Sequence, residues 1–171
     1  DRPKSQSAES RRLPDELRPG RRHPHRLSDE GYKHVDLPMM VTCPTKHRRP
    51  VLVGSAAEIV IETLIHAAQR REARLFGYCA MPDHLHFAIR FANDDLPPRF
   101  LRYFKAEASR RVNVAWGIPG AFRWQRSYWD TFADDSLAVA EQVAYMMENP
   151  VRWGLCERPQ DWPHSADLTK G

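Results

Sequence analysis

Four short stretches of the chain are rich in apolar residues and have Gly, Pro or charged residues at their ends, a pattern that predicts strands. They cover residues 34–43, 74–80, 84–91 and 121–132, of which the last is either a strand or an extended segment. A Met-Pro-Asp turn at residues 81–83 joins the second stretch to the third.

Three longer segments carry apolar residues at helical spacing. They are residues 55–73, residues 98–115, which begin with a proline that fits the first turn, and residues 136–149. Asp135 is placed to cap the last of these helices, and Pro150 is expected to stop it.

The predicted order is strand, helix, strand, strand, helix, strand, helix. The first six elements match the β-α-β-β-α-β arrangement of ferredoxin-like domains, in which two helices cover one face of an antiparallel sheet. We therefore expect an α+β sandwich with an added C-terminal helix. A chain of 171 residues suits one domain, which we expect at residues 34–166.

The net positive charge of the chain lies in its first segment. Residues 1–28 hold eight Arg and Lys against four Asp and Glu, which accounts for the whole formal net charge of +4. This segment has no apolar period, so we expect a disordered basic arm. Of the 26 basic residues 21 are Arg, whose planar guanidinium suits phosphate. A G+C-rich coding bias explains the Arg excess equally well, so charge permits a nucleic-acid partner without requiring one.

Composition excludes several other classes of protein. No stretch is long and apolar enough to span a membrane. The first residues lack the apolar core of a secretory signal. Cys43, Cys79 and Cys156 are far apart and form no CxxC pair, which suits a reducing compartment. We expect a cytoplasmic protein.

The stretch MPDHLHFAIR, residues 81–90, contains two histidines one residue apart. On a strand, Leu85, Phe87 and Ile89 point to one face, whereas His84 and His86 point to the other. Two neighbouring imidazoles can share one metal ion. The polar side of an exposed strand explains the same pattern without a metal, so both interpretations stay open here.

The last predicted helix offers a candidate nucleophile. Tyr145 and Asn149 are four residues apart and share a polar stripe. A phenol beside an amide oxygen donor is suited to be a nucleophile next to a third metal ligand, although an ordinary interfacial tyrosine fits the spacing as well. The apolar face of this helix is expected to consist of Ala140, Val143, Ala144 and Met147.

Four blocks follow one another along the chain: GYCAMPDHLHFAIR at 77–90, WQRSYWD at 124–130, AYMMENPVRWGL at 144–155 and DWPHSA at 161–166. Their order and spacing resemble the REP-associated tyrosine transposases, which are single-tyrosine members of the HUH endonuclease superfamily. The resemblance covers about residues 34–166.

The resemblance implies a chemistry and a set of residues. His84 and His86 match the motif that binds a divalent cation, Mg²⁺ or Mn²⁺, and Asn149 matches the residue that completes this site. Tyr145 matches the tyrosine that attacks DNA. The implied activity is cleavage and rejoining of single-stranded, hairpin-bearing DNA through a phosphotyrosine, by a monomer or a homodimer.

A further group of residues is expected to bind DNA. Basic residues of the helix at 98–115 suit backbone phosphates, and the WQRSYWD block lies near the DNA in relatives. Aromatic side chains in that block suit unpaired bases. A solvated helix face and core packing are the respective alternatives. The residues that we expect to bind DNA are Arg99, Arg102, Lys105, Trp124, Gln125 and Arg126.

Two other functions remain possible at this point. One is a DNA-binding protein that keeps the transposase fold but does not cleave, against which the presence of both histidines and Tyr145 argues. The other is a zinc hydrolase built on the histidine pair. It needs a carboxylate or a third histidine in the site, and it leaves the block around Tyr145 unexplained.

Overall fold

The computed structural model describes residues 37–91, 97–133 and 136–171. The predicted arm at 1–28 and the predicted cap at Asp135 lie outside these residues. The strands are β1 (Met39–Pro44), β2 (Arg74–Met81), β3 (His84–Arg90), β4 (Trp129–Phe132) and β5 (Ser165–Asp167). The helices are α2 (Ser55–Arg70), α3 (Pro97–Trp116), α4 (Ser136–Met147) and α5 (Asn149–Arg152), with 3₁₀ turns η2 (Lys46–Arg48) and η3 (Pro159–Asp161). No helix in the described ranges is long and apolar enough to cross a membrane.

The five strands form one sheet in the order β4-β1-β3-β2-β5, and every neighbouring pair is antiparallel. The first four strands in this order confirm the predicted ferredoxin-like arrangement. The sequence did not predict β5, because three residues reading Ser-Ala-Asp have no apolar pattern. In the register of the sheet, Thr42 on β1 lies opposite both His86 on β3 and Trp129 on β4.

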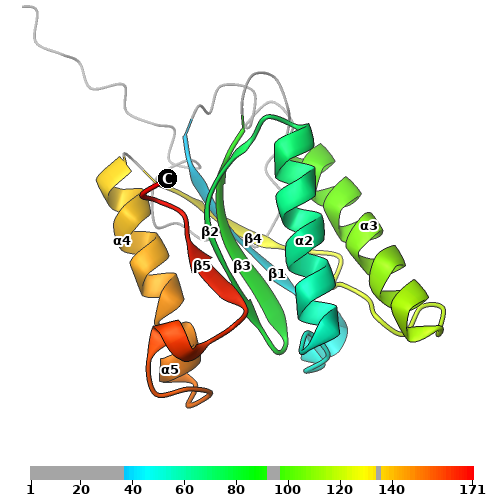
Figure 1. Cartoon of the computed structure of the whole chain (residues 1–171). Coiled ribbons are helices and arrows are strands. Elements are labelled where there is room, and N and C mark those ends of the chain that lie inside the picture. Colours follow the sequence, from blue (N-terminus) through cyan, green and yellow to red (C-terminus); the bar gives the residue numbers. More distant parts are fainter. Residues whose placement is uncertain (1–36, 92–96, 134–135) are drawn as a thin grey trace, which may run out of the picture.

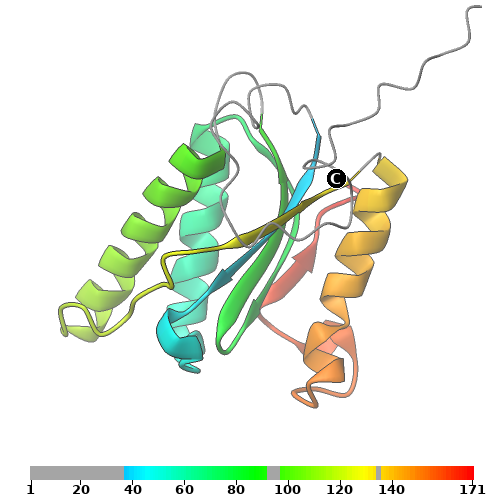
Figure 2. The ribbon, with the colours of Figure 1, turned by 180° about the vertical axis from the view of Figure 1, so that it is seen from behind.

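Helices cover both faces of the sheet (Figure 1). Helices α2 and α3 pack on one face, and α4 packs on the other, as the view from behind also shows (Figure 2). The added C-terminal helix therefore turns the predicted two-layer sandwich into three layers. The sheet face that carries the two histidines is consequently covered rather than open.

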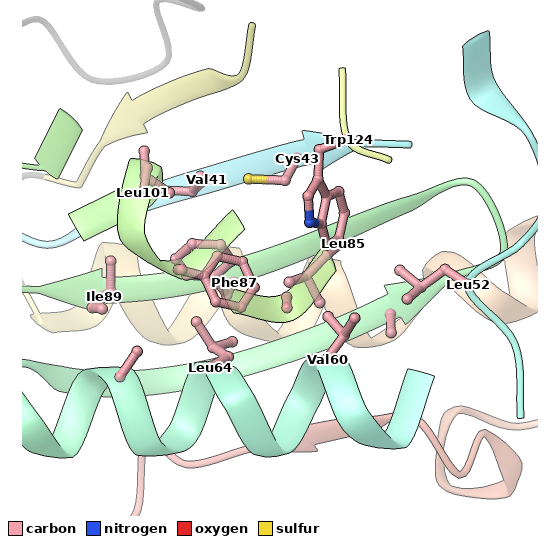
Figure 3. Close-up of a cluster of buried hydrophobic side chains, with 14 of the residues drawn as sticks. Val41, Cys43, Leu52, Val60, Leu64, Leu85, Phe87, Ile89, Leu101 and Trp124 are labelled. Carbon is pink, nitrogen blue, oxygen red and sulfur yellow. The ribbon is translucent and has the colours of Figure 1, made fainter. Parts of the chain in front are cut away.

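The larger core lies between the sheet and helices α2 and α3 (Figure 3). Phe87 on β3 packs edge-to-face on Phe104 of α3, with 6.0 Å between ring centroids. Trp124 is part of the same core and is only 9% exposed. Burial of such large aromatic surfaces is the main stabilising contribution that a core of this kind makes.

The predicted strand at residues 121–132 is regular only over β4. Before β4 the chain makes a single bridge between Thr45 and Trp124, and its backbone is fixed by a side chain. Asn113 on α3 accepts from the Phe122 N–H at 2.7 Å and donates to the Phe122 carbonyl at 3.0 Å. The side chains of Phe122 and Trp124 both point into the larger core, which gives this segment the alternating pattern of a strand. The segment itself is not a regular strand, since it makes one isolated bridge.

A second core lies between the sheet and α4. It is formed by Phe76, Cys79, Met81, Ala88, Val139, Val143 and Met146. The predicted apolar face of this helix is therefore partly wrong, since Ala144 is exposed and Met146 is buried in its stead. Gly77 permits the close approach of α4, because a Cβ there would lie 2.9 Å from the Val143 Cγ1 atom.

Helix α4 ends before Pro150, as predicted, but a second short helix, α5, follows it at once. Helix α4 ends at Met147, Glu148 keeps helical angles (φ −78°, ψ −11°), and Pro150 lies in the first turn of α5. A proline is tolerated there because its missing N–H would have no partner within the helix. Gly154, with φ of +69°, follows the end of α5 in the left-handed conformation that glycine adopts readily. Residues 145, 149 and 152 thus continue at helical spacing.

Candidate active site

A cavity of about 860 Å³ lies between the second face of the sheet and helices α4 and α5. It contains all four residues that the sequence predicts to carry the chemistry. The sheet supplies His84 and His86, and the helices supply Tyr145 and Asn149. Thr42, Arg48, Asp83, Trp129, Gln142 and Trp153 are among the other residues of the lining.

The two histidines face each other directly. Their Nε2 atoms are 2.8 Å apart, and the rings are nearly perpendicular, with centroids 4.4 Å apart. Two imidazole ligands of one ion, each about 2.1 Å from the metal at right angles, have nitrogens about 3 Å apart. His84 is only 4% exposed, so it does not lie on an open polar strand face. The geometry of the pair therefore fits a metal.

The outer nitrogen of each imidazole has its own partner. His84 Nδ1 lies 2.5 Å from an Asp83 carboxylate oxygen, and His86 Nδ1 lies 2.8 Å from the Thr42 hydroxyl. One assignment satisfies the whole chain: Thr42 donates to His86 Nδ1, His86 Nε2–H donates to His84 Nε2, and His84 Nδ1–H donates to Asp83.

Metal binding requires a lone pair on both Nε2 atoms. His84 already offers its lone pair in this assignment. A hydroxyl accepts as well as donates. The His86 proton can therefore move from Nε2 to Nδ1, and the Nδ1–H can then donate a hydrogen bond to the Thr42 hydroxyl. Thr42 and Asp83 are thus the kind of outer partners that orient metal-binding imidazoles.

The surroundings keep His84 uncharged. Burial lowers the pKa of His84 below its usual value, and the hydrogen bond to Asp83 offsets only part of this effect. Arg48, 3.6 Å from the other Asp83 oxygen, neutralises part of the carboxylate charge. A neutral imidazole is the form that binds a metal.

Tyr145 and Asn149 are held together by Arg152. Tyr145 is 68% exposed, and the Arg152 guanidinium lies over its ring, 3.9 Å from the centroid. The same guanidinium donates to the Tyr145 carbonyl at 2.8 Å and to the Asn149 Oδ1 atom. An amide oxygen has two lone pairs, so Asn149 can accept from Arg152 and still offer the second one to a cation.

Gln142 brings a second amide to the cavity, one helical turn before Tyr145. Its Oε1 atom is buried and has no hydrogen-bond partner within the described part of the chain. The described residues contain no group of three His, Cys, Asp or Glu side chains that could hold a metal. Among the described residues, a metal at the histidine pair would thus complete its coordination with amide, phosphate or water oxygens, which does not favour the zinc hydrolase.

The residues predicted to bind DNA lie on the other side of the sheet. A second cavity of about 950 Å³ between α3 and residues 123–128 is lined by Arg102, Lys105, Arg123, Trp124, Gln125 and Arg126, among others. Arg99 is exposed on α3 and is not part of this lining. The structure thus brings five of the six predicted residues to one groove, away from Tyr145.

Two of these residues have clear structural tasks. Lys105 Nζ donates to the Gln125 carbonyl at 2.5 Å and to the Arg126 carbonyl at 3.2 Å, and burial lowers its pKa. Trp124 packs edge-to-face on Phe122 at 5.1 Å in the core. Lys105 therefore shapes the groove, and Trp124 supports its floor rather than offering a free ring to a base.

Several site residues were not predicted from the sequence. Arg152 was missed because Pro150 was taken as the end of the helix, although the spacing 145, 149, 152 would have placed it on the same face. Gln142 shares that face at one turn before Tyr145. Thr42 joins His86 only through the pairing of β1 with β3, which no local pattern shows.

Comparison with known proteins decides the family. The sequence model of the family described as "Transposase IS200 like" matches residues 34–149. The chain belongs to this family. The match includes the histidine pair, Tyr145 and Asn149, and it confirms the resemblance inferred from the four sequence blocks.

Individual relatives agree with this membership. The REP-associated tyrosine transposase of Escherichia coli is 22% identical over 135 residues, which cover 76% of this chain and 78% of that protein. A Haemophilus influenzae protein named for the same transposases is 29% identical over 97 residues, which span 52% of this chain and only 55% of the relative. A solved REP-associated tyrosine transposase bound to a REP hairpin matches the fold with a TM-score of 0.62 at 21% identity, covering 78% of both chains.

Proposed function

We propose that this IS200-like transposase cleaves and rejoins single-stranded, hairpin-bearing DNA through a covalent bond between DNA and Tyr145, assisted by Mg²⁺ or Mn²⁺. The observation that carries the proposal is the shared cavity. Tyr145 on α4 and His84 and His86 on β3 belong to one lining, although they come from two different layers of the fold.

The proposed reaction keeps the energy of the phosphodiester. The Tyr145 oxygen attacks the scissile phosphorus and forms a new P–O bond, and the bond from phosphorus to one sugar oxygen breaks. The phenolic proton is lost to solvent, and the leaving sugar oxygen takes up a proton. A DNA hydroxyl later attacks the phosphotyrosine, which restores a phosphodiester and releases Tyr145.

The metal would be held by His84 and His86 through Nε2, with the Asn149 amide oxygen as the third ligand. When bound, it polarises the phosphate and stabilises the charge that develops on it. Two nitrogen ligands favour Mn²⁺ over Mg²⁺, which prefers oxygen. Asp83 and Thr42 would orient the imidazoles.

Arg152 would position the reacting groups. It contacts the Tyr145 ring, the Tyr145 carbonyl and the Asn149 side chain at once, so it fixes the nucleophile relative to the third ligand. Holding reacting groups in the correct geometry lowers the entropic part of a barrier.

The groove beside α3 would hold another part of the DNA. Arg102 and Arg126 are exposed and line it, Arg99 is exposed nearby, and the described lining contains no Asp or Glu. Such a surface suits phosphates of the backbone, which position a strand without reading its sequence. Its separation from Tyr145 fits a substrate that has both a paired stem and an unpaired strand.

The test is an assay with an end-labelled single-stranded DNA hairpin that carries unpaired flanks. We expect cleavage with Mn²⁺, none with EDTA, and none with the Tyr145→Phe variant. If the protein binds the hairpin tightly but does not cleave it with any of several divalent cations, the non-catalytic DNA-binding protein is favoured instead. Metal-dependent cleavage that persists in Tyr145→Phe would contradict the proposed nucleophile.

A further inference from the structure

Trp153 is a large apolar side chain that is not buried. It follows α5 directly and is 63% exposed. A tryptophan buries 150–250 Å² when it is packed, so leaving one exposed at a cavity commonly marks a surface that binds a partner. Its ring centroid lies 6.2 Å from that of His84, at an interplanar angle of 57°.

The position of Trp153 is fixed by the turn that carries the candidate ligand. Its backbone N–H donates to the Asn149 carbonyl at 3.0 Å, and Gly154 next to it reverses the chain in the left-handed conformation. The indole is therefore anchored to the site through its backbone while most of its ring stays accessible.

The cavity around the indole carries aromatic rings and guanidinium groups that suit a nucleotide, beside the carboxylates of Asp83, Asp130 and Glu141. Trp153 and Tyr145 line the same cavity, so a strand whose phosphate is attacked by Tyr145 would enter the cavity that the indole lines. Two guanidinium groups, Arg48 and Arg152, belong to this region and suit the phosphates. Trp129 lies on the far side of Thr42 from His86, and Arg48 covers its ring at 5.4 Å.

We propose that Trp153 is a stacking platform for the unpaired base of a nucleotide next to the scissile phosphate. This inference rests on the proposed function, because it requires a DNA strand in the cavity. A flat indole stacks on any base, so the contact holds the strand without reading its sequence. An unpaired base is required, since a base inside a duplex has both faces covered.

The test compares two DNA hairpins with the same stem and the same number of phosphates. One has flanks of thymidine, and the other has flanks of abasic residues. Binding of the full chain is measured in EDTA, so no chemistry takes place. We expect Trp153→Ala to weaken binding of the thymidine hairpin about 5- to 100-fold and to leave the abasic hairpin unchanged. Trp153→Phe should keep most of the affinity that Trp153→Ala loses.

The control is Val114→Ala, which alters another exposed apolar residue, on α3 and outside the cavity, and should change neither affinity. An equal loss on both hairpins, no loss on either, or no preference of the unmodified chain for thymidine would each overturn the inference. The cleavage assay is independent of this readout, so the proposed function can fail or survive separately.

Discussion

The Nε2 atoms of His84 and His86 lie 2.8 Å apart, and the Nδ1 atom of each ring is tied to a different neighbour. This arrangement directs both Nε2 atoms toward one point, and the His86 proton needs only to move to Nδ1 for both to offer a lone pair. A pair fixed from both sides loses little conformational entropy on binding, which is the basis of a preorganised site.

The first prediction concerns metal binding. Mn²⁺ should raise the thermal midpoint of the protein, because a ligand that binds only the folded state stabilises it. The His84→Ala, His86→Ala double variant should lose this gain and all cleavage. His66→Ala, an exposed histidine on α2, should keep both. Undiminished metal-dependent cleavage by the double variant would rule out the assigned ligands.

The second prediction concerns the loss of stability when His84 alone is replaced by Ala. The sequence placed both imidazoles on an outward face, where a substitution costs little. His84 is buried instead, so its replacement by Ala leaves a gap and deprives Asp83 of one of its two partners, the other being Arg48. We expect the free energy of unfolding in EDTA to fall by about 1–3 kcal/mol. Urea denaturation measures this, and a change near zero would argue against the packed position of His84.

The third prediction concerns pH. Because burial lowers the folded-state pKa of His84, the unfolded chain binds a proton at this residue more readily than the folded chain. Stability from this group is therefore present above the unfolded pKa and is lost as pH falls toward the lowered folded value. In EDTA, the thermal midpoint should fall as the pH is lowered below 6.5, the ordinary pKa of a histidine. The fall should be steeper for the unmodified protein than for His84→Gln. Equal slopes would contradict a lowered pKa.

The fourth prediction concerns Arg152. Lysine keeps the charge but cannot reproduce a guanidinium that stacks on a ring and donates in two directions. Arg152→Lys should reduce the rate of adduct formation about 10- to 100-fold while hairpin affinity changes little. Single-turnover kinetics at saturating protein separate the two effects. Arg158→Lys, in an exposed ion pair with Asp161, is the matched control. A purely structural Arg152 would change affinity and thermal midpoint along with the rate.

The sequence predicted those parts of the fold that have strong local patterns. Strand β3 and helix α3 were found because their apolar residues follow periods of two and 3.6. The three-residue β5 and the irregular chain before β4 have no such period. The packing of α4 on the sheet face that carries His84 could not be predicted, because it depends on how distant elements dock.

Similar reasons decide which residues of the candidate site the sequence could suggest. His84, His86, Tyr145 and Asn149 lie in recognisable motifs. Thr42 depends on strand register, and Arg152 on the short helix α5 that has Pro150 in its first turn, which a local rule for proline did not predict. For Trp124 the sequence left base contact and core packing both open, because alternation on an extended segment does not reveal which side is covered, and the structure places it in the core.

The central claim is that the Tyr145 hydroxyl becomes bonded to DNA, and trapping that bond tests it most directly. The protein is incubated with Mn²⁺ and a labelled hairpin, denatured, digested, and the labelled peptide is sequenced by mass spectrometry. We expect the nucleotide on the peptide that contains AYMMENP, full labelling in Tyr128→Phe, and none in Tyr145→Phe, which removes one exposed oxygen and should fold and bind DNA normally. An adduct in Tyr145→Phe, or a label on Tyr128, would contradict the assignment.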